Sequence, residues 1–263
     1  RQMKEQKRLG LKSLIEKGVN AKDIAVLYRI NALSRSLEEG FTKERLSYKL
    51  IGGIRFYERS EIKDIISYLR ILTNLNDDFS LVRIINKPKR GIGKTSIDKL
   101  QNLSIKNNCS IFSLYKNHRD LISQELGKKA DASIGELFEN LISLQDEIKN
   151  GKLADLLDIL ENKIKLKAYY QSLPDGYERV LNIDEFYGFF QESILLNPDL
   201  QLEELLNDIS LQSDQDSITN DAISIMSIHA AKGLEFEYVY VIGLEEEFFP
   251  LLGDECNIEE ERR

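Results

Sequence analysis

The pattern of apolar residues changes twice along the chain, and these changes limit the folds that it can adopt. Short apolar runs at Asp23–Tyr28 and Tyr48–Ile51 are each followed by a stretch with helical spacing. Strand-like runs return at Ala222–Ile228 and Tyr238–Ile242, whereas residues 74–220 show helical spacing only. An alternation of strands and helices predicts an α/β sheet layer. Because strand patterns occupy both ends, we predict one α/β domain with an all-helical domain inserted into it.

We therefore predict three segments along the chain. Residues 1–73 form the first part of the α/β domain, 74–220 the helical domain, and 221–263 the second part of the α/β domain. A length of 263 residues suits one large or two ordinary domains. The chain opens on a charged run and stops at Glu260–Arg263 without a turn, so we expect it to be a piece of a longer protein.

Cysteine and histidine are scarce, which excludes several kinds of site. The two cysteines are Cys109 and Cys256, too few for a disulfide framework or a cysteine-built zinc site. The two histidines, His118 and His229, lie far apart in sequence, so we predict no metal site within this chain. No apolar stretch approaches the roughly 20 residues of a membrane span, and the charged start does not resemble a signal peptide. We therefore expect a cytoplasmic protein that does not associate with a membrane.

The charge distribution points to one positive segment in an acidic chain. The 36 Lys and Arg residues against 44 Asp and Glu residues give a net charge of −8, which by itself argues against nucleic acid as a partner. Between Val82 and Lys99, however, six basic residues face one acid, Asp98, for a net charge of +5. Local charge governs contact with phosphates more than the total does. These bases are Arg83, Lys87, Lys89, Arg90, Lys94 and Lys99.

Within this segment, Pro88–Thr95 superficially matches the phosphate-binding P-loop. A P-loop requires glycine at its first position, so that the backbone can turn and aim its amides at phosphates. Here that position is Pro88, which fixes φ and has no amide proton. The segment also lies between two helical patterns and does not follow a strand. We therefore reject the P-loop.

A helix–turn–helix that contacts a nucleic-acid backbone explains the same residues better. Gly91, Ile92 and Gly93 predict a tight, exposed turn, and Thr95 or Ser96 is expected to cap the next helix. Free backbone amides at that helix start would then lie beside the side chains of Lys94, Arg90 and Lys89. A phosphate fits such a site without any reading of bases. The alternative is a solvated basic loop that only caps a helix.

A second candidate site is the end of the first strand, at Tyr28 and Arg29. In open α/β sheets, ligands bind at the carboxyl ends of the strands. A tyrosine face can stack on a base, and an arginine can hold phosphate oxygens with two donors. The alternative is a core tyrosine followed by a solvated arginine.

A third candidate site is the run from Ser227 to Phe236. Ala230 and Ala231 allow close approach, and Gly233 supplies backbone freedom. His229 and Lys232 can donate to phosphates, and Glu235 can accept from a ribose hydroxyl. A Ser–His–acid hydrolase lacks support because no G-x-S-x-G elbow is present. A lone structural histidine remains the simpler alternative.

Together these segments resemble the UvrD/PcrA/Rep-type superfamily-one DNA helicases, over essentially the whole chain. The matching segments are Asp23–Asn31 with Ser34, Arg35, Glu38 and Glu39; Gly52–Asp64; Arg83–Gly93; Ser227–Phe236; and Gly243–Pro250 with Glu260–Arg263. The resemblance implies a RecA-like subdomain of the P-loop NTPase type, called 2A, which is split in sequence and lacks its own P-loop. The inserted all-helical part would be the 2B subdomain.

The resemblance also implies residue roles. Tyr28 would stack on adenine, Arg29 would reach the γ-phosphate as a catalytic arginine finger, and Glu235 would touch the ribose. Ser227, His229 and Lys232 would line the single-stranded DNA track or couple it to the nucleotide site. The basic turn, with Arg90, Gly91, Ile92, Gly93, Lys94 and Thr95, would contact duplex DNA.

The implied function is that of an ATP-dependent DNA helicase with 3′-to-5′ polarity, acting in DNA repair or replication in the bacterial cytosol. Its cofactor would be ATP with Mg²⁺, and the metal ligands and Walker loops would lie in the 1A and 1B subdomains before Arg1. This chain by itself is then expected to be inactive. The alternatives are the helicase region of a RecB- or AddA-like helicase–nuclease and, for the isolated chain, a non-enzymatic DNA-binding module. Protein partners cannot be read from the sequence.

Overall fold

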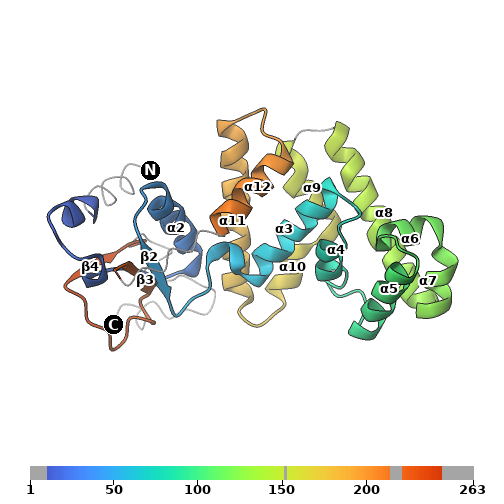
Figure 1. The fold of residues 1–263 in the computed structure, drawn as a ribbon, viewed down its shortest axis with the longest axis horizontal. Coiled ribbons are helices and arrows are strands. Elements are labelled where there is room, and N and C mark those ends of the chain that lie inside the picture. Colours follow the sequence, from blue (N-terminus) through green and yellow to red (C-terminus); the bar gives the residue numbers. More distant parts are fainter. Residues whose placement is uncertain (1–10, 151–152, 214–220, 245–263) are drawn as a thin grey trace. The chain divides into compact units, whose positions relative to one another are not determined.

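The computed structural model describes residues 11–150, 153–213 and 221–244 (Figure 1). Residues 11–16 are helical. Residues 1–10, which hold the charged run that opens the chain, lie outside the described part. So do residues 214–220 and the resembling segments from Glu245 onward, including Glu260–Arg263.

The four strands of the described chain form one parallel sheet. They are β1 (Ile24–Tyr28), β2 (Tyr48–Ile51), β3 (Ile223–Ser227) and β4 (Tyr238–Val241), in the order β2-β3-β1-β4. All four predicted strands are thereby confirmed. Strand β1 pairs with β3 so that Tyr28 lies opposite Ser227, and with β4 so that Leu27 lies opposite Val241. The two ends of the described chain thus meet in the middle of one sheet.

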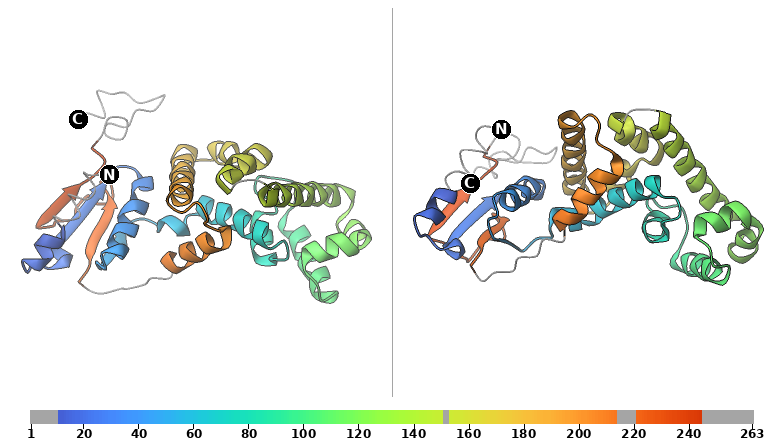
Figure 2. Two further views of the ribbon diagram at one scale, coloured as in Figure 1. Left: turned by 90° about the horizontal axis from the view of Figure 1, so that it is seen from above. Right: turned by 45° about the horizontal axis from the view of Figure 1, so that its top comes forward.

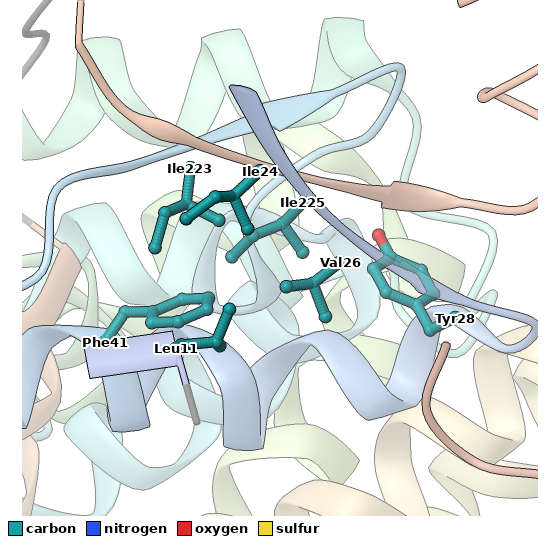
Figure 3. Close-up of a cluster of buried hydrophobic side chains, with 7 residues drawn as sticks. All are labelled: Leu11, Ile24, Val26, Tyr28, Phe41, Ile223 and Ile225. Carbon is teal, nitrogen blue, oxygen red and sulfur yellow. The ribbon is translucent and has the colours of Figure 1, made fainter. Parts of the chain in front are cut away.

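One face of the sheet is covered by apolar side chains from two helical segments. Leu11, from the helix at 11–16, and Phe41, from α2 (Ser34–Lys43), pack against the alternate residues of β1 and β3. Figure 3 shows these side chains pointing toward one another, and Figure 2 shows the sheet from two further directions. The strand residues in this cluster are Ile24, Val26, Tyr28, Ile223 and Ile225. Alternation along the strands places every second residue on this face.

The middle of the chain is helical throughout its described residues. Its helices are α3 (Ser60–Thr73), α4 (Asp78–Ile84), α5 (Lys94–Lys106), α6 (Ile111–Asn117), α7 (Arg119–Leu126), α8 (Lys128–Asn150), α9 (Leu156–Ile164), α10 (Leu166–Gln171), α11 (Gly176–Leu196) and α12 (Leu202–Ser213). Short 3₁₀ helices occur at η1 (Ala21–Asp23), η2 (Asn31–Leu33), η3 (Phe56–Glu58) and η4 (Leu153–Asp155). None of the helices in the described ranges is both long and apolar enough to cross a bilayer.

Helix α3 is the central element of the helical part. It packs against α4, α8 and α11 (Figure 1), and most of its residues are buried. The chain divides into two compact units, one formed by Arg1–Arg59 with Leu211–Arg263 and the other by Ser60–Ser210. The mixed α/β class with an inserted helical part is confirmed. In this division α3 belongs to the helical unit, whereas the sequence pattern placed it with the first strands.

Candidate functional site

The carboxyl ends of β1 and β3 bring two predicted site segments together. Because the strands are parallel neighbours and Tyr28 lies opposite Ser227, the residues after each strand emerge at the same edge of the sheet. The backbone N–H of Ile228 extends this pairing by donating to the carbonyl of Tyr28 at 2.8 Å. Arg29 and His229 therefore lie side by side, although 200 positions separate them in the sequence.

The side chains of Arg29 and His229 are in direct contact. Nη1 of Arg29 lies 3.2 Å from Nδ1 and 3.3 Å from Nε2 of the imidazole. Arginine is always a donor, so a neutral imidazole can accept the hydrogen bond through one ring nitrogen. A residue predicted to contact nucleotide and a residue predicted to contact single-stranded DNA thus share one interaction.

The turn after β3 is shaped by its own backbone and by one hydroxyl. Oγ of Ser227 accepts a hydrogen bond from the backbone N–H of Ala230 at 3.2 Å. The N–H of Leu234 donates to the carbonyl of Ala231 at 3.0 Å, and Gly233 lies within this turn with φ of +84°. The side chains of His229, Lys232 and Glu235 are exposed. The turn therefore presents two donors and one acid to solvent, and Ser227 supports their position.

The predicted close approach at the small residues of this turn is present. A Cβ atom placed on Gly52 would lie 3.0 Å from Cβ of Ala230. Gly52 also has φ of +69°, a conformation that side chains rarely adopt. Gly52 after β2 and Ala230 after β3 thus approach each other closely at the carboxyl edge of the sheet.

Tyr28 is buried, whereas its predicted role of stacking on adenine requires an exposed ring. Only 1% of its surface is exposed, and it belongs to the core cluster of the sheet (Figure 3). The face of its ring is covered in this conformation, so stacking on a base would require the side chain to turn out of the core. The position instead matches the alternative of a core tyrosine at the end of a strand.

Helix α2 and the segment around η3 share a polar network that the sequence did not single out as a site. Glu38 accepts hydrogen bonds from Oγ of Ser34 at 2.7 Å and from the backbone N–H of Phe56 at 3.3 Å. Arg59 donates to the same Ser34 hydroxyl at 2.7 Å. Burial raises the pKa of Glu38, and these hydrogen bonds and the charge of Arg59 partly oppose that shift. The four-residue spacing of Ser34 and Glu38 on a helix is the sequence signal for this pair.

A second acid on the same helix continues this network. Nη1 of Arg35 lies 2.7 Å from both carboxylate oxygens of Glu39, and Tyr57 donates to Glu39 at 2.8 Å. The resembling segments around Ser34–Glu39 and Gly52–Asp64 are therefore tied together by hydrogen bonds. Their residues stabilise the loops that follow β1 and β2.

The basic turn lies between α4 and α5, so the described fold has a helix where a P-loop requires a strand. Helix α5 begins at Lys94, and its N-cap is Gly93, which provides no side-chain capping bond. The predicted capping by Thr95 or Ser96 is therefore wrong. Gly91 has φ of +73°, which explains the glycine at this position. Lys94 and Thr95 are exposed in the first turn of the helix.

Ile92 corrects the expectation of a fully exposed turn. Its side chain is 0% exposed, although both neighbouring glycines are exposed. The turn is therefore anchored by an apolar side chain that points into the helical unit. Ile92 contributes to the fold of the turn and presents no side chain to a ligand.

The six basic residues of this segment face in different directions. Nε of Arg83 and Nζ of Lys87 each lie 2.7 Å from the carboxylate of Asp64, which is fully buried and also accepts from Tyr170. Lys99 donates to the carbonyl of Glu125 at 2.9 Å. The net charge of +5 along the sequence is thus partly neutralised within the fold.

Arg90 also points inward, which departs from its predicted contact with phosphate. Its guanidinium donates to the carbonyls of Ile84, Ile85 and Pro88 at 3.0, 3.3 and 3.2 Å, and to Oη of Tyr68 at 2.8 Å. Lys89 and Lys94 remain exposed. These two lysines and the uncapped amides at the start of α5 form the outer surface of the turn.

The comparisons with known proteins identify the family of this chain. Residues 3–263 match the family described as the UvrD-like helicase C-terminal domain, and the chain belongs to this family. It is 39% identical over 260 residues to the ATP-dependent DNA helicase PcrA of Staphylococcus aureus, covering 94% of this chain. The PcrA of Bacillus subtilis is also 39% identical, over 253 residues. The chain spans 35% of the first relative and 34% of the second.

Proposed function

We propose that this chain forms the 2A and 2B subdomains of an ATP-dependent DNA helicase with 3′-to-5′ polarity. The observation that carries the proposal is the contact between Arg29 and His229 in a member of this family. In this proposal Arg29 contacts the nucleotide and His229 contacts single-stranded DNA. Because the two side chains touch, binding of DNA to His229 can change the position of Arg29 at the nucleotide.

The residues at the carboxyl edge of the sheet provide some of the groups that ATP binding requires. Arg29 supplies a planar cation for phosphate oxygens, and the exposed carboxylate of Glu235 supplies an acceptor for ribose hydroxyls. Tyr28 would supply a stacking face only after leaving the core. The chemistry that ATP brings is phosphoryl transfer to water, and most of its binding groups are assigned to the 1A and 1B subdomains of the parent protein.

Mg²⁺ does not suit the described part of this chain. Within residues 11–150, 153–213 and 221–244, no three His, Cys, Asp or Glu residues come together where they could hold a metal ion. We assign the ligands of Mg²⁺ to the parent protein outside the described residues.

In the proposed mechanism, Arg29 acts on charge that develops during hydrolysis. A guanidinium that approaches the γ-phosphoryl group stabilises the transition state more than the ground state. His229 and Lys232 donate to phosphates of single-stranded DNA, and Ser227 holds their turn in place. When DNA draws His229 away, Arg29 loses one partner and becomes available to the nucleotide. DNA binding would thereby stimulate hydrolysis.

The helical unit contributes the contact with duplex DNA. The exposed Lys89 and Lys94 and the free amides at the start of α5 form a surface for phosphates. The same surface supports a second proposal, that the isolated chain behaves as a non-enzymatic DNA-binding module. We further propose that the parent acts in the cytoplasm in DNA repair or replication. A parent that also carries a nuclease, as in RecB- or AddA-like proteins, remains the alternative.

Substitution of Arg29 in the full-length protein tests the proposal. Arg29→Ala should lower kcat for ATP hydrolysis by about 10³–10⁵ while ATP binding changes little, because an arginine finger acts in the transition state. His229→Ala should raise hydrolysis without DNA, because Arg29 loses this partner permanently, and it should lose much of the further stimulation by single-stranded DNA. Lys49→Ala removes an exposed charge from β2 and is the matched control. A change in KM alone for Arg29→Ala would contradict the assigned role.

A further inference from the structure

The loop between α4 and α5 is closed by the side chain of a single residue, Asn86. Its Oδ1 accepts hydrogen bonds from the backbone N–H of Arg90 at 2.7 Å and of Ile92 at 3.3 Å. Both donors belong to the basic turn, and Asn86 follows directly after α4. One amide oxygen therefore fixes the path of the backbone on both sides of Gly91.

The guanidinium of Arg90 supports the turn from the inner side. The carbonyls of Ile84 and Ile85 lie at the end of α4, where a helix leaves its last carbonyls without internal partners. A cation is also favourable there, because the helix dipole is negative at this end. Arg90 thus donates hydrogen bonds to carbonyl groups at the end of α4 and links this end to the turn.

Tyr68 of α3 extends the same support into the core of the helical unit. Its ring is fully buried, and its hydroxyl donates to the carbonyl of Lys87 at 2.5 Å while accepting from Arg90 at 2.8 Å. Burial raises the pKa of Tyr68 to about 12, so the hydroxyl keeps its proton and continues to donate well above neutral pH. Ile92, which is fully buried, adds an apolar anchor.

We propose that Asn86 and Arg90 are positioning residues for duplex binding: they set the shape of the turn, while Lys89, Lys94 and the amides at the start of α5 contact phosphate. This inference rests on the proposed contact between the turn and DNA. It reassigns Arg90, whose four hydrogen bonds are all made within the protein. A residue in this role changes affinity through geometry, and a phosphate contact changes it through charge.

The salt dependence of duplex binding separates these two roles. Loss of one phosphate contact flattens the slope of log affinity against log salt by about 0.9, whereas loss of a positioning residue leaves the slope nearly unchanged. We expect Asn86→Ala in the full-length protein to weaken binding about tenfold, because two backbone donors lose their acceptor. Lys94→Ala should weaken binding and also flatten the slope. Lys106→Ala, an exposed lysine at the other end of α5, is the matched control.

Two conservative variants sharpen the comparison. Arg90→Lys keeps the positive charge but loses the planar set of donors, so it should weaken binding about as much as Arg90→Ala does. Asn86→Asp keeps the acceptor oxygen, so at high salt it should bind more tightly than Asn86→Ala. Far-ultraviolet circular dichroism and thermal unfolding would show whether each variant is folded. If Asn86→Ala does not fold, the comparison of Arg90→Lys with Arg90→Ala tests the inference instead.

Two results would overturn the inference while leaving the DNA contact of the turn in place. The first is a wild-type affinity for Arg90→Lys together with a slope flattened by about 0.9 in Arg90→Ala, which would make Arg90 a phosphate contact. The second is an unchanged affinity for folded Asn86→Ala while Lys94→Ala is weakened. Unchanged affinity and slope in both Lys94→Ala and Asn86→Ala would instead remove the DNA contact itself, and the inference with it.

Discussion

At the scale of single residues, neighbours in the basic turn have opposite roles. Ile92 is buried between two exposed glycines, and the exposed Lys94 follows after Gly93. An apolar side chain gains free energy by leaving water, while a charged one is costly to bury without a partner. A substitution at Ile92 should therefore act through the stability of the helical unit, and one at Lys94 through binding.

Ile92→Asp should destabilise the protein by about 3 kcal/mol or more, because it buries a carboxylate in an apolar site. Thermal or denaturant unfolding measures this loss. Thr95→Asp is a suitable control, since it adds the same charge at an exposed position in the first turn of α5, where a negative charge is tolerated. Equal stability of the two variants would show that Ile92 is not the anchor of the turn.

At the scale of elements, the polar network between α2 and η3 stabilises the loops that carry the candidate site. The carboxyl group of Glu38 is held among Ser34, Phe56 and Arg59 in a buried position. Because burial raises its pKa, the folded protein binds this proton more tightly than the unfolded chain does. Between the ordinary value of 4.5 and the raised value, this group therefore lowers stability as the pH rises.

Glu38→Gln should remove this pH dependence, since an amide does not titrate but keeps an acceptor oxygen for the N–H of Phe56. We expect the free energy of unfolding of the wild type to fall relative to the variant as the pH rises above about 4.5. Unfolding of both proteins across this pH range measures the difference. A difference that is independent of pH, or that grows in the opposite direction, would contradict the raised pKa.

At the scale of the whole molecule, the two compact units supply different proposed functions. The α/β unit carries Arg29, His229 and Glu235, and the helical unit carries the basic turn. The described residues place Arg29 at the sheet edge but include no P-loop, because the candidate segment lies between α4 and α5. Binding of DNA and hydrolysis of ATP should therefore be separable.

The purified 263-residue chain should not hydrolyse ATP, with or without DNA, because the groups that cradle the phosphates are absent from its described part. A coupled-enzyme assay measures hydrolysis, and the full-length protein is the positive control. DNA-stimulated hydrolysis by the chain alone, abolished by Lys94→Ala, would restore Lys94 as a P-loop lysine. It would also contradict the division of the site between this chain and the rest of the parent.

The sequence alone determined the strands and the split α/β part, and it placed Arg29 at the end of a strand. The tertiary structure decided that β1 and β3 are neighbours, so that Arg29 and His229 meet. Apolar runs report local structure directly, and parallel strands present their carboxyl ends at one edge. Only the tertiary structure decided that Tyr28 and Ile92 are buried and that Arg90 turns inward. It also decided that Arg83 and Lys87 pair with Asp64 and that α5 starts without a side-chain cap. Whether a side chain faces solvent depends on helices distant in sequence, such as α3, and a local pattern of charge contains no information about them.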